Sequence, residues 1–182
     1  MKEIHYMIRM LGYWHCGSGQ AAGADVDALV IKDKDGLPFI PGKTLKGLVR
    51  QAFEEIAAFK GESSVEGDRL FGIPGGAPSK TYFTDAQIVE KDEIIKDGLS
   101  EWLYQTVSMT EIDSNTGTAS EHSLRKIEVV VPCALKGRIL FVEDGSADKI
   151  KDALRYIKAI GLDRNRGLGR CSFENIDIEE EN

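Results

Sequence analysis

The hydrophobic residues of this chain change their spacing several times, and the order of these changes constrains the fold. Alternation of apolar and polar residues predicts strands, and apolar residues three and four apart predict helices. The segments that follow one or the other spacing are, in order, residues 3–14 (strand), 43–60 (helix), 80–89 and 127–142 (strands), 147–160 (helix) and 171–178 (strand). This β-α-β-β-α-β order predicts an α+β fold of the ferredoxin-like kind, with an antiparallel sheet and two helices on one face.

The length of the chain, 182 residues, fits one domain spanning 1–182. Residues 105–125 are rich in Thr, Ser, Asn and Gly and predict an insertion into that domain. No apolar run reaches the roughly 20 residues that cross a bilayer. The first residues alternate and do not resemble a secretion signal, so we expect a cytoplasmic protein that does not contact a membrane.

The three cysteines, Cys16, Cys133 and Cys171, are far apart in the sequence and form no C-x-x-C pair. This spacing indicates neither a disulfide framework nor a zinc site. We interpret them as reduced thiols that pack in strands or loops.

The segment Ile40–Arg50, I-P-G-K-T-L-K-G-L-V-R, begins the first helix with a basic stripe. Its cations Lys43, Lys46 and Arg50 are three and four residues apart, which places them on one face. Free amides at a helix start, the positive end of the helix dipole and three cations together predict an anion site. The segment is not a P-loop, because that motif needs a glycine at position 37, where this chain has Leu37.

A second basic element lies in the glycine-rich loop 161–170. Its arginines can bind phosphate oxygens in a bidentate manner, and its glycines allow the backbone to approach a ligand closely. The residues concerned are Arg164, Arg166, Gly167, Gly169 and Arg170. Two phosphate-seeking elements in a chain of net charge −7 predict a defined track for a polyanion such as RNA.

Two aspartates, Asp25 and Asp27, end an earlier glycine-rich loop, 15–27. A carboxylate beside a phosphate-binding surface suits metal-assisted or acid–base strand cleavage. The alternative is a turn aspartate that caps local amides. His15 has the same two interpretations, an RNA contact or a packed histidine at a strand end.

Taken together, these motifs resemble the RAMP superfamily, the RNA-binding proteins of CRISPR effector complexes, and in particular the repeated backbone subunit of type III complexes. The matching segments are H-C-G-S-G (15–19), D-A-L-V-I-K-D (27–33), I-P-G-K-T-L-K-G-L-V-R (40–50), L-F-G (70–72), I-D-S-N-T-G-T-A (112–119) and R-G-L-G-R (166–170). The set occurs in the order typical of that family.

The resemblance implies an RNA-recognition-motif-like core that self-associates into a helical filament on a guide RNA (crRNA), together with other effector subunits. Residues 105–125 would form a thumb-like hairpin that presses between bases. Asp27 would cut the target RNA with Mg²⁺ or another divalent metal as cofactor. His15 and the cations of the two basic elements would contact RNA.

Two alternatives remain open at this point. Glu111 and Glu121 make the thumb region less basic than in the relatives, so the chain could hold crRNA while another protein cuts. It could also be a guide-RNA-processing endonuclease, for which His15 is the candidate general base.

Overall fold

The structure of the chain is a computed structural model that describes residues 1–20, 26–63, 65–73, 75–110, 117, 118, 120 and 123–180. Its strands are β1 (Lys2–Met10), β2 (Phe39–Ile40), β3 (Tyr82–Phe83), β4 (Ala86–Ile88), β5 (Tyr104–Met109), β6 (Arg125–Val130), β7 (Ala134–Val142) and β8 (Cys171–Glu180). Its helices are α1 (Gly42–Lys60), α2 (Val65–Phe71), α3 (Lys91–Lys96) and α4 (Ala147–Tyr156), with the short 3₁₀ turns η1 (Ser100–Leu103) and η2 (Asp144–Ser146).

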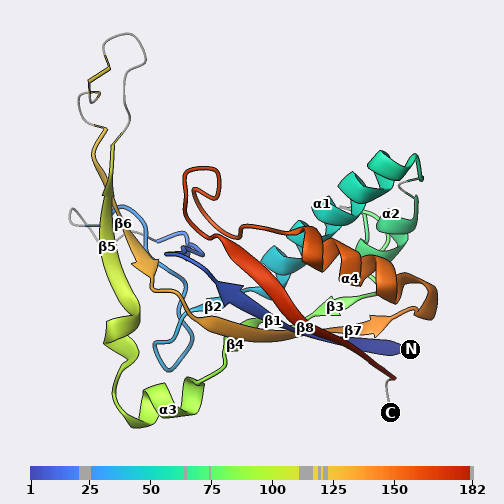
Figure 1. Cartoon of the computed structure of the whole chain (residues 1–182), viewed down its shortest axis with the longest axis horizontal. Helices are drawn as coiled ribbons and strands as arrows, with labels where there is room; N and C mark the ends of the chain where they lie inside the picture. Colours follow the sequence, from blue (N-terminus) through green and yellow to red (C-terminus); the bar gives the residue numbers. More distant parts are fainter. Residues whose placement is uncertain are drawn as a thin grey trace.

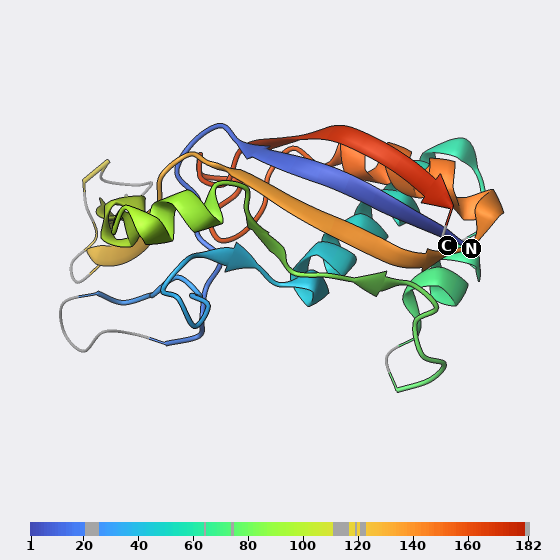
Figure 2. The ribbon, with the colours of Figure 1, turned by 90° about the horizontal axis from the view of Figure 1, so that it is seen from below.

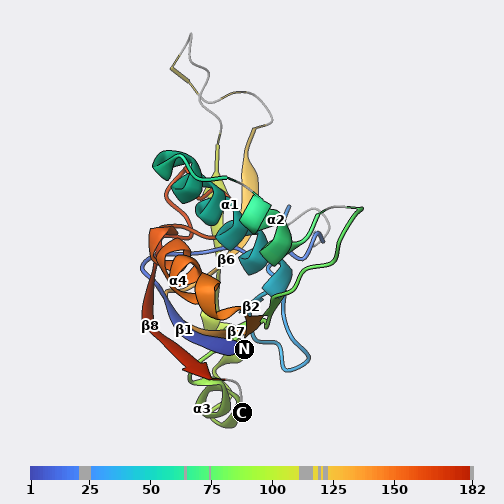
Figure 3. The ribbon, with the colours of Figure 1, turned by 90° about the vertical axis from the view of Figure 1, so that its right-hand side faces the viewer.

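The main sheet has the strand order β2-β4-β7-β1-β8, and β3 also pairs with β7. All of these pairs are antiparallel. Helices α1 and α4 both lie on one face of this sheet (Figures 1 and 3). Figure 2 shows β8, β1 and β7 side by side, with the two chain ends close together. The predicted α+β class with an antiparallel sheet is confirmed.

Buried and exposed residues alternate along β1 because this strand lies inside the main sheet, between β7 and β8. Ile4, Ile8 and Met10 are buried on the helix-covered face, whereas Arg9 is exposed on the other face. The apolar stripe of α1 meets the same core through Leu45, Val49 and Phe53, and α4 adds Ile150 and Leu154. Burial of aliphatic side chains of this size stabilises the fold by about 1.5–3 kcal/mol each.

The helix predicted at 147–160 is shorter in the structure, where α4 ends at Tyr156. Ile157 and Ile160 are nevertheless buried, in the extended segment that follows. The N–H of Ile160 donates to the carbonyl of Gly169, so this segment is held by the loop that follows it. Apolar spacing alone could not distinguish these buried loop residues from a further helical turn.

The segment predicted as one interrupted strand, 127–142, is two strands in two different sheets. β6 pairs with β5 to form a separate antiparallel hairpin, and β7 belongs to the main sheet. The chain changes sheets at 131–133, around Pro132. In Figure 1 the hairpin stands away from the main sheet.

The β5–β6 hairpin brackets most of the predicted insertion, and most of its tip lies outside the described residues. Glu111, Glu121 and most of the I-D-S-N-T-G-T-A segment fall there, as does Asp25 in the first glycine-rich loop. None of the helices in the described part of the chain is both long and apolar enough to cross a membrane.

Candidate nucleic-acid interface

A cleft of about 790 Å³ lies between the tip end of the β5–β6 hairpin strands, where Met109 pairs with Arg125, the segment that begins at Asp27 and the loop 161–170. We call it the Asp27 cleft. Its charged lining residues are Asp27, Arg125, Asp163 and Arg166, from three separate parts of the sequence. The fold therefore brings the candidate catalytic aspartate and one arginine of the predicted basic loop into a single concave site.

Asp27 is held in this cleft by strand β6. Its N–H donates to the carbonyl of Lys126 at 2.8 Å, and its Oδ2 accepts from the N–H of Lys126 at 2.7 Å. Among the described residues no hydrogen bond reaches its Oδ1, and the residue is exposed. Asp27 thus combines a fixed backbone with one carboxylate oxygen available to a ligand.

Two cations line the cleft together with this carboxylate. Arg125, the first residue of β6, and Arg166 are both exposed, and neither forms an ion pair within the described part of the chain. Asp163 lines the same cleft and has a positive φ of 52°, and its carbonyl accepts from the N–H of Arg166 at 2.7 Å. Free guanidinium groups on both sides of a groove are suited to bind successive phosphates of a strand.

The loop 161–170 connects the cleft with α1. Whereas Arg166 lines the cleft, the Arg164 guanidinium lies 3.5 Å from Oε1 of Gln51 on α1. Arg170 is exposed at the end of the loop, directly before β8. The loop that carries the second predicted basic element therefore touches α1 through Arg164 and Gln51.

Gly167 and Gly169 of this loop differ in whether a side chain would fit at their positions. Gly169 has φ 69° and its Cα lies against the chain itself, because an added Cβ would lie 1.9 Å from the carbonyl oxygen of Ile160. Gly167 has φ 95° with open space around the Cβ position. The expectation that these glycines allow close approach to a ligand is corrected for Gly169, whose close approach is to Ile160.

The start of α1 is closed by the chain's own residues. The N–H of Gly42 donates to Oδ1 of Asp85 at 2.8 Å, and the N–H groups of Thr44 and Leu45 donate to the carbonyl of Pro41. An added Cβ at Gly42 would lie 2.1 Å from the carbonyl oxygen of Phe83, which explains the glycine. The prediction that free amides at the helix start bind an anion is therefore wrong for Gly42, Thr44 and Leu45, whose N–H groups already have partners in the chain.

The cations of α1 divide into two groups. Lys43 is exposed and Lys46 is half-buried, and neither forms an ion pair with a residue in the described ranges. Arg50 is different: its guanidinium donates to Oε1 of Glu54 at 2.7 Å, to the Gly72 carbonyl at 2.7 Å and to Oδ1 of Asp68 at 2.6 Å.

These contacts tie α1 to α2, and they raise the pKa of the Arg50 guanidinium, chiefly through its hydrogen bond to Glu54. These contacts use three of the five N–H donors of Arg50. We therefore correct the assignment of Arg50, whose main role in this structure is to tie α1 to α2.

His15 also has a structural position. Its side chain is only 1% exposed, and Nδ1 donates to the carbonyl of Glu128 at 2.6 Å. The carbonyl of His15 accepts from the N–H of Leu162, which links it to the loop beside the cleft. The structure therefore supports a packed histidine at position 15. The prediction that His15 contacts RNA directly is corrected.

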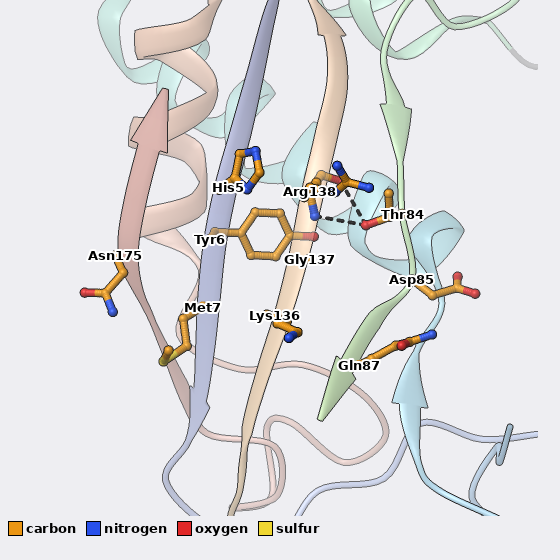
Figure 4. A pocket seen from close by; sticks show the side chains of 10 residues that line it. All are labelled: His5, Tyr6, Met7, Thr84, Asp85, Gln87, Lys136, Gly137, Arg138 and Asn175. Atoms are coloured by element: carbon orange, nitrogen blue, oxygen red, sulfur yellow. Dashed lines mark hydrogen bonds between the residues drawn. The ribbon is translucent and has the colours of Figure 1, made fainter. Parts of the chain in front are cut away.

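A second hollow, of about 550 Å³, lies across the main sheet (Figure 4). There the Tyr6 ring extends from β1 over Gly137 of β7, and an added Cβ at Gly137 would lie 2.6 Å from the Tyr6 hydroxyl. This hydroxyl is buried without a hydrogen-bond partner among the described residues. Burial and, secondly, the Asp85 carboxylate raise the pKa of Tyr6, so the phenol stays neutral.

Comparison with protein families identifies the chain. The sequence profile of the RAMP superfamily matches residues 7–172, which include the Asp27 segment, the start of α1 and the arginine–glycine loop. The chain belongs to the RAMP superfamily. No curated protein sequence matches it.

Solved structures with the same fold come from type III-B Cmr-beta complexes. A chain of Cmr-beta bound to cognate target RNA aligns with a TM-score of 0.74 at 17% identity, over 98% of this chain and 61% of that one. A chain of Cmr-beta in the apo state aligns with a TM-score of 0.73 at 14% identity, over 94% of this chain and 96% of that one. This RAMP chain thus spans about three fifths of the first of these chains and nearly all of the second. At these identities the likeness shows the fold.

Sequence reasoning missed three charged residues of this RAMP chain's candidate interface. Arg125 is the last residue of the predicted insertion 105–125 and the first of β6, and this position was the available signal. Asp163 belongs to the arginine–glycine loop, where only the cations were considered. Glu128 sits in an ordinary strand pattern, and no local signal marks its contacts with distant residues.

Proposed function

We propose that this RAMP chain is a crRNA-binding backbone subunit of a type III CRISPR effector complex that also cuts target RNA at the Asp27 cleft. The observation that carries the proposal is that Asp27, Arg125 and Arg166 line one cleft at the tip end of the β5–β6 strands. Cations there would hold the RNA backbone, and the carboxylate would act on one phosphodiester.

Three further points support the proposal. The chain belongs to the RAMP superfamily, and a chain of similar fold comes from a type III-B complex bound to cognate target RNA. The strand order β4-β7-β1-β8 with two helices on one face is the order of a ferredoxin-like core. The β5–β6 hairpin projects from that core where the thumb-like region was expected.

The carboxylates of the cleft fit a divalent cation held largely by water and phosphate. Mg²⁺ usually binds through one or two carboxylates together with waters and substrate phosphates. Asp27, whose Oδ1 has no hydrogen bond from a described residue, and Asp163 supply that number, and no group of three His, Cys, Asp or Glu residues occurs in the described ranges. A cation bound there would offset negative charge on the cleaved phosphate and acidify a bound water.

The chain's own residues would have separate tasks in this reaction. Asp27 would face the scissile phosphate through Oδ1 while Lys126 keeps its Oδ2 fixed. Arg125 and Arg166 would bind the phosphates on either side, which aligns the strand in the cleft. Lys43, Lys46, Arg164 and Arg170 would extend the basic track along α1 and the loop, while partner subunits and further copies of this chain would extend it along the guide.

The binding half of the proposal is tested by charge reversal in the cleft. We expect Arg166→Glu to weaken guide and target binding and to reduce the dependence of affinity on salt by about one phosphate contact. Lys80→Glu is the matched control, because Lys80 is exposed and pairs with Glu143 rather than with a cleft residue. If Arg166→Glu binds RNA with the affinity and salt dependence of the wild type, the cleft does not hold RNA.

The non-catalytic alternative predicts the same RNA binding without cleavage by any variant. It is distinguished by incubating the assembled complex with target RNA and Mg²⁺ and comparing wild type with Asp27→Ala. Guide processing by His15 is the weaker candidate, because the buried His15 already donates Nδ1–H to a backbone carbonyl.

A further inference from the structure

Glu128, near the middle of β6, connects the segment that begins at Asp27 with the hairpin. Its Oε2 accepts from the N–H of Val30 at 3.0 Å and its Oε1 accepts from Nζ of Lys32 at 2.9 Å. Its backbone N–H donates to the Ala28 carbonyl at 3.0 Å, and its backbone carbonyl accepts from Nδ1 of His15 at 2.6 Å. One residue therefore contacts three of the five residues that follow Asp27.

The burial of this carboxylate makes its contacts necessary. The Glu128 side chain is 14% exposed, and a charge in that position is stable only when hydrogen-bonded or paired. Lys32 provides the pair and also lies 3.8 Å above the centroid of the Tyr104 ring on β5. A single chain of contacts thus runs from the Asp27 segment through Glu128 and Lys32 to both strands of the hairpin.

The segment after Asp27 has few other anchors on this side. Its opposite edge is held by the first glycine-rich loop, where the N–H of Ser18 donates to Leu29 and the N–H of Ile31 donates to Cys16. On the hairpin side the bonds come from Lys126 and Glu128. The N–H of Val30 is satisfied by a side chain rather than by a strand carbonyl, so its partner can be removed by mutation without altering the β6 backbone.

We propose that Glu128 is a positioning residue that fixes Asp27 relative to strand β6 of the hairpin. The inference rests on the proposed function, in which Asp27 acts on a phosphate held by Arg125. Arg125 lies on β6, the strand that also carries Glu128. Glu128 does not touch RNA. It sets the distance between the strand that binds the substrate and the segment that carries the carboxylate, and a displacement of about 1 Å can reduce a rate by about 100-fold.

The test compares Glu128→Gln with Glu128→Leu in the assembled effector complex. Glutamine keeps a neutral oxygen that accepts from the N–H of Val30, whereas leucine leaves this N–H without a partner. At saturating target RNA and Mg²⁺ we expect the Glu128→Leu complex to cleave roughly 10- to 100-fold more slowly, as is typical when a supporting residue is removed. We expect Glu128→Gln to cleave within about threefold of wild type, and both variants to bind target RNA like wild type.

A matched control is Glu143→Leu, because Glu143 also pairs with two cations, Lys80 and Arg69, but outside the Asp27 cleft. We expect its cleavage rate to equal that of wild type. A second measurement, amide hydrogen exchange of the isolated chain, should show faster exchange in residues 27–31 for Glu128→Leu and not for Glu128→Gln.

Cleavage by Glu128→Leu at the wild-type rate, or unchanged exchange in residues 27–31, would overturn the positioning role. A loss of RNA affinity that accounts for the whole loss of cleavage would also overturn it. Equal cleavage by wild type and Asp27→Asn would instead refute the proposed function, and the exchange measurement would then decide alone whether Glu128 fixes this segment.

Discussion

The backbone N–H of Lys126 donates a 2.7 Å hydrogen bond to Oδ2 of Asp27, which couples the candidate catalytic carboxylate to strand β6 of the hairpin. In the sequence these two residues are 99 positions apart. The contact places the acidic group and the neighbouring Arg125 on one rigid unit. This arrangement leads to predictions for RNA binding, folding and cleavage.

Arg50 and Lys43 should respond differently to mutation although both lie on α1. Arg50→Met removes hydrogen bonds to Glu54, Asp68 and the Gly72 carbonyl, so we expect the free energy of unfolding to fall by about 2 kcal/mol. Lys43→Met should leave stability unchanged and weaken RNA binding. Urea denaturation of the isolated chain and RNA titration check this, and the reverse pattern would restore Arg50 as an RNA ligand.

Two tyrosines should respond in opposite ways to loss of their hydroxyl group. Tyr6→Phe removes a buried hydroxyl without a partner, and we expect the free energy of unfolding to rise by about 1 kcal/mol. Tyr104→Phe removes a hydroxyl that donates to the Gly36 carbonyl at 2.7 Å, and we expect a decrease of about 1 kcal/mol. Thermal unfolding of both variants provides the comparison. A destabilised Tyr6→Phe variant would mean that this hydroxyl has a partner in solution.

The glycines of the arginine–glycine loop should differ in their tolerance of alanine. Gly167→Ala meets no neighbouring atom, so its cost is the positive φ alone, about 1–2 kcal/mol. Gly169→Ala places a Cβ against the Ile160 carbonyl and should destabilise the chain by more than that. Denaturation midpoints measure the difference, and equal midpoints would contradict the close contact at Gly169.

The cysteines should be unreactive in the folded chain. Burial raises the pKa of Cys16 and of Cys171 to about 12 and that of Cys133 to about 11. At pH 8 the thiolate fraction is then very small, and a thiol reagent should modify all three residues only after unfolding.

The raised pKa values of the three thiols determine how the stability of the fold changes with pH. Because the folded pKa values lie above the unfolded ones, near 8.5, the thiols' contribution to stability is complete below that pH. It decreases as the pH rises from about 9 toward 12. Rapid labelling of native protein at pH 8 would contradict the burial of these groups.

The sequence predicted those parts of the fold that depend on local spacing. The start of α1 at Gly42 and the alternation of β1 were predicted, because each follows from periodic burial against one core. The division of 127–142 between two sheets was not, because both halves have strand-like patterns and only the long-range pairing of β6 with β5 separates them.

The candidate site was predictable in its residue types more than in its contacts. Asp27 and Arg166 were selected from separate motifs, and the fold places them in one cleft. Arg50 was misassigned because its partner Asp68, on α2, is 18 positions away and nothing in the local sequence links the two residues. Asp85 was not considered, since its bond to Gly42 joins residues 43 positions apart and leaves no mark in the local sequence.

The measurement that tests the central claim most directly is cleavage of target RNA by assembled complexes that carry Asp27→Asn. Asparagine retains an oxygen that can accept from the Lys126 N–H, so the variant removes the charge of the carboxylate and keeps its anchor. We predict that, with Mg²⁺ and saturating target RNA, cleavage falls at least about 100-fold while assembly and RNA affinity stay at wild-type values. Cleavage by Asp27→Asn at the wild-type rate would show that the cut is made elsewhere.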